Sequence, residues 1–181
     1  MTKKIFIANW KMNLSLEGRE NLANDFKKEL GEIKDQDIVI CPSTDSLIPI
    51  ANIIKDSQLQ LGAQNVFWKD SGAYTGETSP VILKDIGCQY VIVGHSERRE
   101  YLKETDEMVN KKVQACLENN LTPILCIGET REARQEGQTD NVLHNQLIND
   151  LARPRSLALI LVSNNLSKYL GLLGSMEVAL R

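Results

Sequence analysis

The most informative segment of this sequence is Val91-Ile92-Val93-Gly94-His95-Ser96-Glu97-Arg98-Arg99. A β-branched run stops at a glycine, and one of only two histidines in the chain follows at once. Ser96, a suitable cap, and Glu97 then open a predicted helix. Catalytic side chains of α/β enzymes stand at the carboxyl ends of parallel strands, and a helix N-terminus biases a histidine towards its neutral form. The stretch therefore makes His95 a candidate catalytic residue.

Similar short apolar runs recur along the chain and alternate with helical patterns. The runs begin near Ile5, Ile38, Leu59, Tyr90 and Leu121. Helices are predicted over 16–30, from Ser79-Pro80 to Gly87, after Thr105, and over 139–151. A sixth strand is predicted over 157–162. Runs that are apolar on both faces, separated by helices, predict an α/β fold with a parallel sheet. The pattern alone leaves a barrel and a doubly wound sheet equally open.

Composition excludes several classes of function. The 181 residues carry a net charge of −3 without a basic stripe or a long charge run. This argues against nucleic acid or an anionic membrane as a partner. No run is long enough for a membrane span or a signal-peptide core, so we expect a cytoplasmic protein. The four cysteines lack metal-ligand spacing, and we expect no metal site and no cofactor.

Several motifs, in this order and spacing, resemble one family. They are Phe6-Ile7-Ala8-Asn9-Trp10-Lys11-Met12-Asn13, Gly62-Ala63-Gln64-Asn65, Gly72-Ala73-Tyr74-Thr75-Gly76-Glu77, the His95 stretch, and Pro123-Ile124-Leu125-Cys126-Ile127-Gly128-Glu129-Thr130. Residues 1–151 closely resemble triosephosphate isomerase. The resemblance selects the TIM (β/α)₈ barrel, here incomplete, with about five to six of its eight βα units. A whole barrel of this kind takes about 250 residues.

The resemblance also implies a reaction. Triosephosphate isomerases interconvert dihydroxyacetone phosphate and glyceraldehyde 3-phosphate in glycolysis and gluconeogenesis, and they are themselves a standard example of pKa-tuned catalysis. By resemblance, His95 is the catalytic electrophile, and Asn9 and Lys11 bind the substrate. Ser96, Glu97 and Cys126 support the site. His144 is expected on the surface of a late helix.

The family is homodimeric, and the resemblance assigns its interface. The matching residues are Gln64, Asn65, Tyr74, Thr75, Gly76 and Glu77, with Thr75 reaching the active site of the neighbouring subunit. A small phosphorylated triose is the expected substrate.

The resemblance stops after residue 151, and the segment 152–181 diverges from the family. The family's base is a glutamate in a Glu-Pro-aliphatic-Trp pattern. Glu177, the one acidic residue after Asp150, lacks that setting, so no residue is assigned as catalytic base. Shifting plausible codons for Trp-Ala-Ile-Gly by one base yields Gly-Leu-Leu-Gly, the sequence of residues 171–174. We therefore hypothesise that the tail is family sequence read in a shifted frame, which the genomic DNA would test.

Three hypotheses about the function of this protein follow from the sequence. The first is a triosephosphate isomerase whose activity the missing base would diminish. The second is a non-catalytic barrel fragment that associates with a full-length subunit. The third, a flavodoxin-like binding domain, is disfavoured because no glycine-rich phosphate loop follows the first strand.

Overall fold

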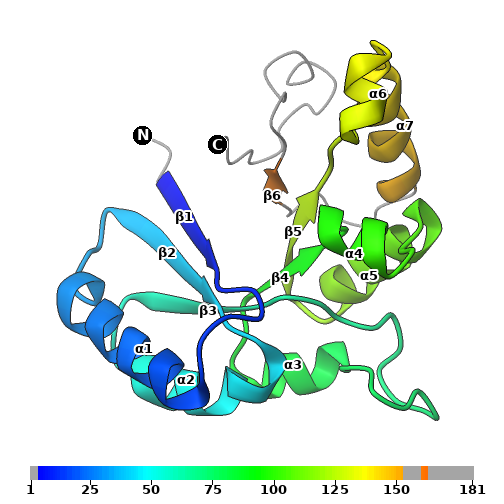
Figure 1. The fold of residues 1–181 in the computed structure, drawn as a ribbon. Coiled ribbons are helices and arrows are strands. Elements are labelled where there is room, and N and C mark those ends of the chain that lie inside the picture. The colour runs from blue at the N-terminus through cyan, green and yellow to red at the C-terminus, as the bar shows by residue number, and fades with distance from the viewer. Residues whose placement is uncertain (1–3, 153–159, 163–181) are drawn as a thin grey trace.

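A single curled parallel sheet organises the chain. The computed structural model describes residues 4–152 and 160–162. Its strands are adjacent in sequence order and run side by side with helices outside them (Figure 1). They are β1 (Lys4–Asn9), β2 (Gln36–Cys41), β3 (Leu59–Ala63), β4 (Tyr90–Val93), β5 (Thr122–Cys126) and β6 (Ile160–Val162). Sequential order with parallel pairing throughout is the arrangement of a barrel wall, so the expected incomplete (β/α)₈ barrel is confirmed.

The helices follow the strands as βαβ units require. They are α1 (Leu16–Leu30), α2 (Leu47–Ile54, after the 3₁₀ turn Thr44–Ser46), α3 (Pro80–Ile86), α4 (Ser96–Tyr101), α5 (Asp106–Glu118), α6 (Arg131–Gln135) and α7 (Thr139–Asp150). The structure confirms the predicted ends of α3 and the predicted start of α5. Ser79 accepts hydrogen bonds from the first turn of α3, Gly87 ends that helix in a left-handed conformation, and Thr105 caps α5. The sequence patterns did not predict α2 or α6.

Alternate residues of each strand face opposite sides of the sheet. Ile38 and Ile40 of β2 pack with the helices in the larger core. Val39 and Cys41 pack with Ile124 in a smaller core on the inner face. Period-two alternation with apolar residues on both sides explains why the strands read as continuous apolar runs.

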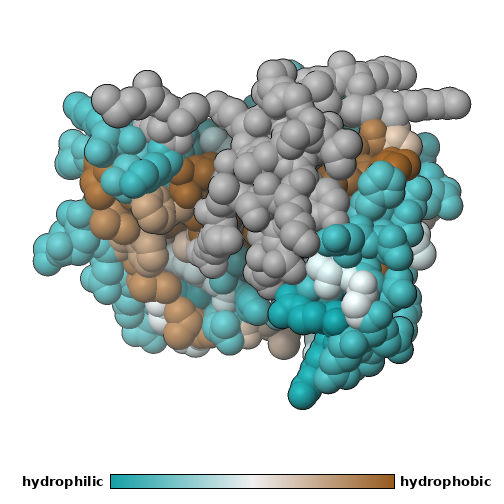
Figure 2. All heavy atoms as spheres, turned by 90° about the horizontal axis from the view of Figure 1, so that it is seen from above, coloured by the Kyte–Doolittle hydropathy of each residue, from teal (hydrophilic) through white to brown (hydrophobic). Residues whose placement is uncertain are grey.

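The sheet does not close among the described residues. β1 pairs only with β2, and β6 pairs only with β5, so each leaves one edge without a described partner strand. Phe6, on the edge strand β1, remains 51% exposed. Seen from above, apolar residues are visible in separate areas at the left and right of this face, among hydrophilic ones (Figure 2). An edge strand with an exposed aromatic side chain favours association.

The tail is described only in part. Of the strand predicted over 157–162, the structure describes 160–162, where β6 continues the sheet beside β5. The division at residue 151 and the frame-shift hypothesis for the tail fall wholly or partly outside the described residues and stay predictions. Within the described ranges, no helix has the length and apolar character needed to cross a membrane.

Candidate active site

The turn between β4 and α4 determines where His95 lies. Gly94 has a φ of +72°, and a Cβ there would lie 2.9 Å from Nη2 of Arg99 and 3.1 Å from the carbonyl oxygen of Cys126. Only glycine adopts this conformation readily and leaves this space. The chain therefore turns tightly after the strand, and His95 becomes the N-cap residue of α4.

The imidazole of His95 takes part in that cap. Its Nδ1 accepts a hydrogen bond from the backbone N–H of Glu97 at 3.3 Å, so the proton of the neutral ring lies on Nε2. Burial lowers the pKa of His95, Glu97 opposes this shift, and the nearby Lys11 ammonium adds to it. The expected neutral form is therefore supported, but burial is its largest cause here. The helix begins at Ser96, as predicted, and its N-cap is His95 and not Ser96.

Lys11 lies on the turn after β1, where hydrogen bonds to its backbone N–H and carbonyl groups hold it. Its φ is +54°, and its N–H donates to Oδ1 of Asn9 at 3.0 Å. The side-chain amide of Gln64 donates to the carbonyl oxygen of Lys11 at 3.0 Å and to that of Cys41 at 2.9 Å. The ends of β1, β2 and β3 are thereby tied together beneath Lys11.

Glu97 joins Lys11 to His95. Nζ of Lys11 lies 2.6 Å from Oε1 of Glu97, and Nδ1 of His95 lies 3.4 Å from Oε2. The hydrogen bond from Lys11 lowers the pKa of Glu97. A cation, a carboxylate and a neutral imidazole therefore meet at the carboxyl ends of β1 and β4, the two sites that the sequence singled out. Asn9 belongs to the same cluster through Lys11.

Cys126 lies at the end of β5 with its side chain among the inner-face residues. Burial raises the pKa of its thiol to about 12, so the thiol stays protonated at neutral pH. It behaves as a small apolar residue there. Its supporting role, like that of Ser96, stays a prediction.

The segment between β3 and α3 carries the residues assigned to a subunit interface. In Figure 1 it extends away from the body of the molecule. Thr75, Gly76 and Glu77 are exposed, and Tyr74 is 42% exposed with its ring 4.6 Å from that of Phe67. The interface assignment stays a prediction.

The two remaining interface candidates make contacts within the chain. Oδ1 of Asn65 accepts a hydrogen bond at 2.7 Å from Lys112, which also forms a buried ion pair with Glu104. Gln64 braces the Lys11 turn, a role that the sequence analysis did not assign to it. The position of Gln64 directly after an apolar strand could have indicated this role, because the carboxyl ends of parallel strands lie at one edge of the sheet.

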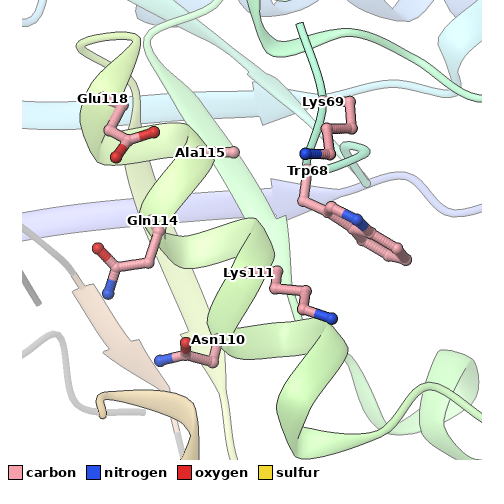
Figure 3. Close-up of a pocket in the computed structure, with 7 residues that line it drawn as sticks. All are labelled: Trp68, Lys69, Asn110, Lys111, Gln114, Ala115 and Glu118. Atoms are coloured by element: carbon pink, nitrogen blue, oxygen red, sulfur yellow. The ribbon is translucent and has the colours of Figure 1, made fainter. Parts of the chain in front are cut away.

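The remaining surface features lie away from His95 and Lys11. A groove of about 320 Å³ lies between α5 and the segment after β3, where Lys111 sits 5.8 Å above the Trp68 ring (Figure 3). Neither His95 nor Lys11 lines it. His144 is exposed on α7, as expected. In the described part of the chain, His, Cys, Asp and Glu side chains form no group that could hold a metal ion.

Comparison with known proteins identifies the family. A model of the family Triosephosphate isomerase matches residues 4–162. The triosephosphate isomerase of Dictyoglomus turgidum is 46% identical over 147 residues, which are 81% of this chain and 59% of the relative. That of Dehalococcoides mccartyi strain CBDB1 is 48% identical over 81% of this chain and 58% of the relative. That of Trichodesmium erythraeum is 46% identical over 83% and 63%, respectively.

The chain therefore spans about three fifths of the length of these curated relatives. The matched region includes all the strands that position Asn9, Lys11, His95 and Glu97. The family match and the curled parallel sheet agree, and the chain belongs to the triosephosphate isomerase family.

Proposed function

We propose that this chain carries the carbonyl-polarising half of a triosephosphate isomerase site, for the interconversion of dihydroxyacetone phosphate and glyceraldehyde 3-phosphate. The observation that carries the proposal is the hydrogen bond from the Glu97 amide to Nδ1 of His95. It leaves Nε2–H as the donor of a neutral ring, and Glu97 also holds the Lys11 ammonium. Family membership supports the same reaction.

The chemistry assigned to these residues is electrostatic. When a proton leaves the carbon beside the substrate carbonyl, the electron pair moves into a carbon–carbon double bond and negative charge develops on the carbonyl oxygen. Nε2–H of His95 donates to that oxygen, and Lys11 stabilises the charge. The neutral imidazole keeps one N–H, on Nε2, because Nδ1 accepts the Glu97 amide, and this N–H is the donor that the proposal requires.

The proton itself needs a base. This sequence contains no match to the family's Glu-Pro-aliphatic-Trp segment. General base catalysis typically contributes about 10²–10⁴-fold to a rate. We therefore expect the chain by itself to turn over far more slowly than a complete isomerase.

The open sheet favours a second candidate, a non-catalytic barrel fragment that associates with a full-length subunit. The ends of the described strand order, β1 and β6, which each pair with one described strand, and the exposed Phe6 support it. In either case we place the protein in the cytoplasm and in glycolysis, and we propose dimerisation through Gln64, Asn65 and the segment 72–77, as the resemblance implies.

An isomerase assay on the purified chain tests the proposal, with His95→Gln as the variant and His144→Gln as its matched control. We expect turnover several orders of magnitude below the typical enzyme median of about 10 s⁻¹. His95→Gln should abolish it and His144→Gln should not. Equal rates in the chain and in His95→Gln would refute the proposal. If turnover falls below detection, a phosphoglycolate-type anion must shift the His95 ring resonances, and failure to do so favours the second candidate.

A further inference from the structure

One residue holds both peptide groups that flank His95. The backbone N–H of Arg99 donates to the carbonyl oxygen of His95 at 3.1 Å. The side-chain Nε–H of Arg99 donates to the carbonyl oxygen of Gly94 at 2.8 Å. The orientations of these two peptide planes set φ and ψ of the histidine, and with them the direction of its Cα–Cβ bond.

The other end of the guanidinium is anchored on two helices. Nη1 of Arg99 lies 2.5 Å from Oδ1 of Asp106, in the first turn of α5. Nη2 lies 2.7 Å from Oδ2 of Asp150, the last residue of α7. The side chain of Asp150 is fully buried, and that of Arg99 is 15% exposed. One planar group therefore links β4, α5 and α7 behind the turn of His95.

The anchors are themselves braced. The side-chain amide of Asn149 donates to Oδ2 of Asp106 at 3.3 Å. That of Asn110 donates to the carbonyl oxygens of Asp150 and Ala152, at 2.9 and 3.0 Å. Arg99 therefore lies between groups that hold one another in place.

Arginine is the residue that this position requires. Its rigid fork presents donors in three directions at once, which the single ammonium of lysine does not. Gly94 leaves the space, since a Cβ at that residue would approach Nη2 of Arg99 to 2.9 Å.

We propose that Arg99 is a positioning residue for His95. It fixes the backbone on both sides of the histidine, so that Nδ1 meets the amide of Glu97 and Nε2–H points towards the substrate carbonyl. The inference rests on the proposed function only for the chemistry of His95. The coupling between Arg99 and the ring is independent of turnover.

The neighbouring Arg98 provides a matched control. Its backbone N–H also donates to the carbonyl oxygen of His95, at 2.8 Å. In the described part of the chain its side chain instead lies 3.4 Å from Oε2 of Glu104 and makes no hydrogen bond to Gly94. Arg98→Lys therefore disturbs the ion pair between α4 and Glu104 without removing the side-chain hydrogen bond of Arg99 to Gly94.

The test compares Arg99→Lys with Arg98→Lys in the full chain by two NMR readouts. The first is amide hydrogen exchange of Glu97, referred to that of the buried Val113. The second is the pair of His95 ring nitrogen shifts, which report the tautomer. We expect Arg99→Lys to accelerate relative exchange at Glu97 about tenfold and to move both nitrogen shifts towards a tautomer average. Arg98→Lys should leave the relative exchange rate of Glu97 within twofold and the two ring nitrogen shifts of His95 unchanged.

Unchanged Glu97 exchange and nitrogen shifts in Arg99→Lys, or equal changes in Arg98→Lys, would overturn the proposal. If Arg99→Lys does not fold, Asp106→Asn removes the charge of one anchor and leaves the other contacts in place. It should accelerate exchange at Glu97 about threefold, and no acceleration would count against the proposal. Loss of isomerase activity with intact coupling would reject the proposed function alone.

Discussion

Lys11 and Glu97 are 86 residues apart in the chain, yet Nζ of the lysine lies 2.6 Å from Oε1 of the glutamate. The contact joins the turn after β1 to the first turn of α4. Both side chains are nearly half exposed, at 48% and 45%, so the pair adds little to stability. Its consequence is electrostatic, because the same carboxylate also faces His95.

Replacing Glu97 by Gln should lower the pKa of His95 further. The carboxylate now opposes the downward shift that burial causes, and Gln removes that opposition. Because Glu97 is partly exposed, we expect its removal to change the pKa of His95 by no more than about one unit. The measurement is an NMR titration of the His95 ring, with the exposed Glu100→Gln on the same helix as control. A rise in the pKa of His95 would contradict the electrostatic account.

Lys11 should confer weak affinity for anions. We expect a phosphoglycolate-type anion to bind no better than about millimolar, or roughly 4 kcal/mol, with weaker binding at higher salt. Lys11→Ala should reduce affinity severalfold, whereas Lys34→Ala, at an exposed position in the connection between α1 and β2, should not. Calorimetric titration measures this. Micromolar affinity, or indifference to Lys11, would reveal another phosphate site.

Asp150 should make stability depend on pH. Burial raises the pKa of its carboxyl group to about 8. Between roughly pH 4 and 8 the folded state keeps a proton that the unfolded state releases, so the free energy of unfolding falls as pH rises, by at most about 1.4 kcal/mol per unit. Asp150→Asn should flatten the dependence and the exposed Asp85→Asn should not. Urea denaturation from pH 5 to 9 is the measurement, and an unaltered slope in Asp150→Asn would argue against a buried proton there.

Gly94→Ala should destabilise the fold more than Gly137→Ala does. Both glycines have a positive φ, +72° and +70°, so the backbone strain is similar. Only at Gly94 does a Cβ meet neighbours, at 2.9 Å and beyond. We expect strain of about 1 kcal/mol at both sites and about 1–3 kcal/mol more at Gly94 from overpacking. Denaturant midpoints measure both, and equal losses would mean that the turn relaxes.

Phe6 should contribute to self-association more than to stability. It is 51% exposed on the edge strand, whereas Ile124 is 1% exposed. Phe6→Lys should therefore reduce association in sedimentation velocity, whereas Ile148→Lys, at an exposed position on α7, should not. Ile124→Ala should cost about 2–5 kcal/mol as a buried truncation. Association unaffected by Phe6→Lys would point to a different surface.

Local chemistry made several parts of the fold predictable from the sequence. Ser79, Pro80 and Gly87 bound α3 because capping and left-handed termination act within a few residues. The β-branched runs identified β1 to β5 because strands covered on both faces are apolar throughout. The sequence also placed His95 and Lys11 at strand ends. It missed α2, whose Leu-Ile-Pro-Ile-Ala-Asn-Ile-Ile segment has no polar face to show helical periodicity and carries a proline in its first turn.

The contacts between these residues depend on the folded structure. The imidazole of His95, not the hydroxyl of Ser96, caps α4 because the turn at Gly94 directs Nδ1 towards the Glu97 amide. The buried Asp150 meets Arg99, 51 residues away, and nothing within either local segment specifies that distance. Such pairs form because parallel strands bring their carboxyl ends to one edge of the sheet and the helices pack back against it. Hydrogen bonds and ion pairs depend on distances of a few ångströms, which only the assembled sheet and helices set.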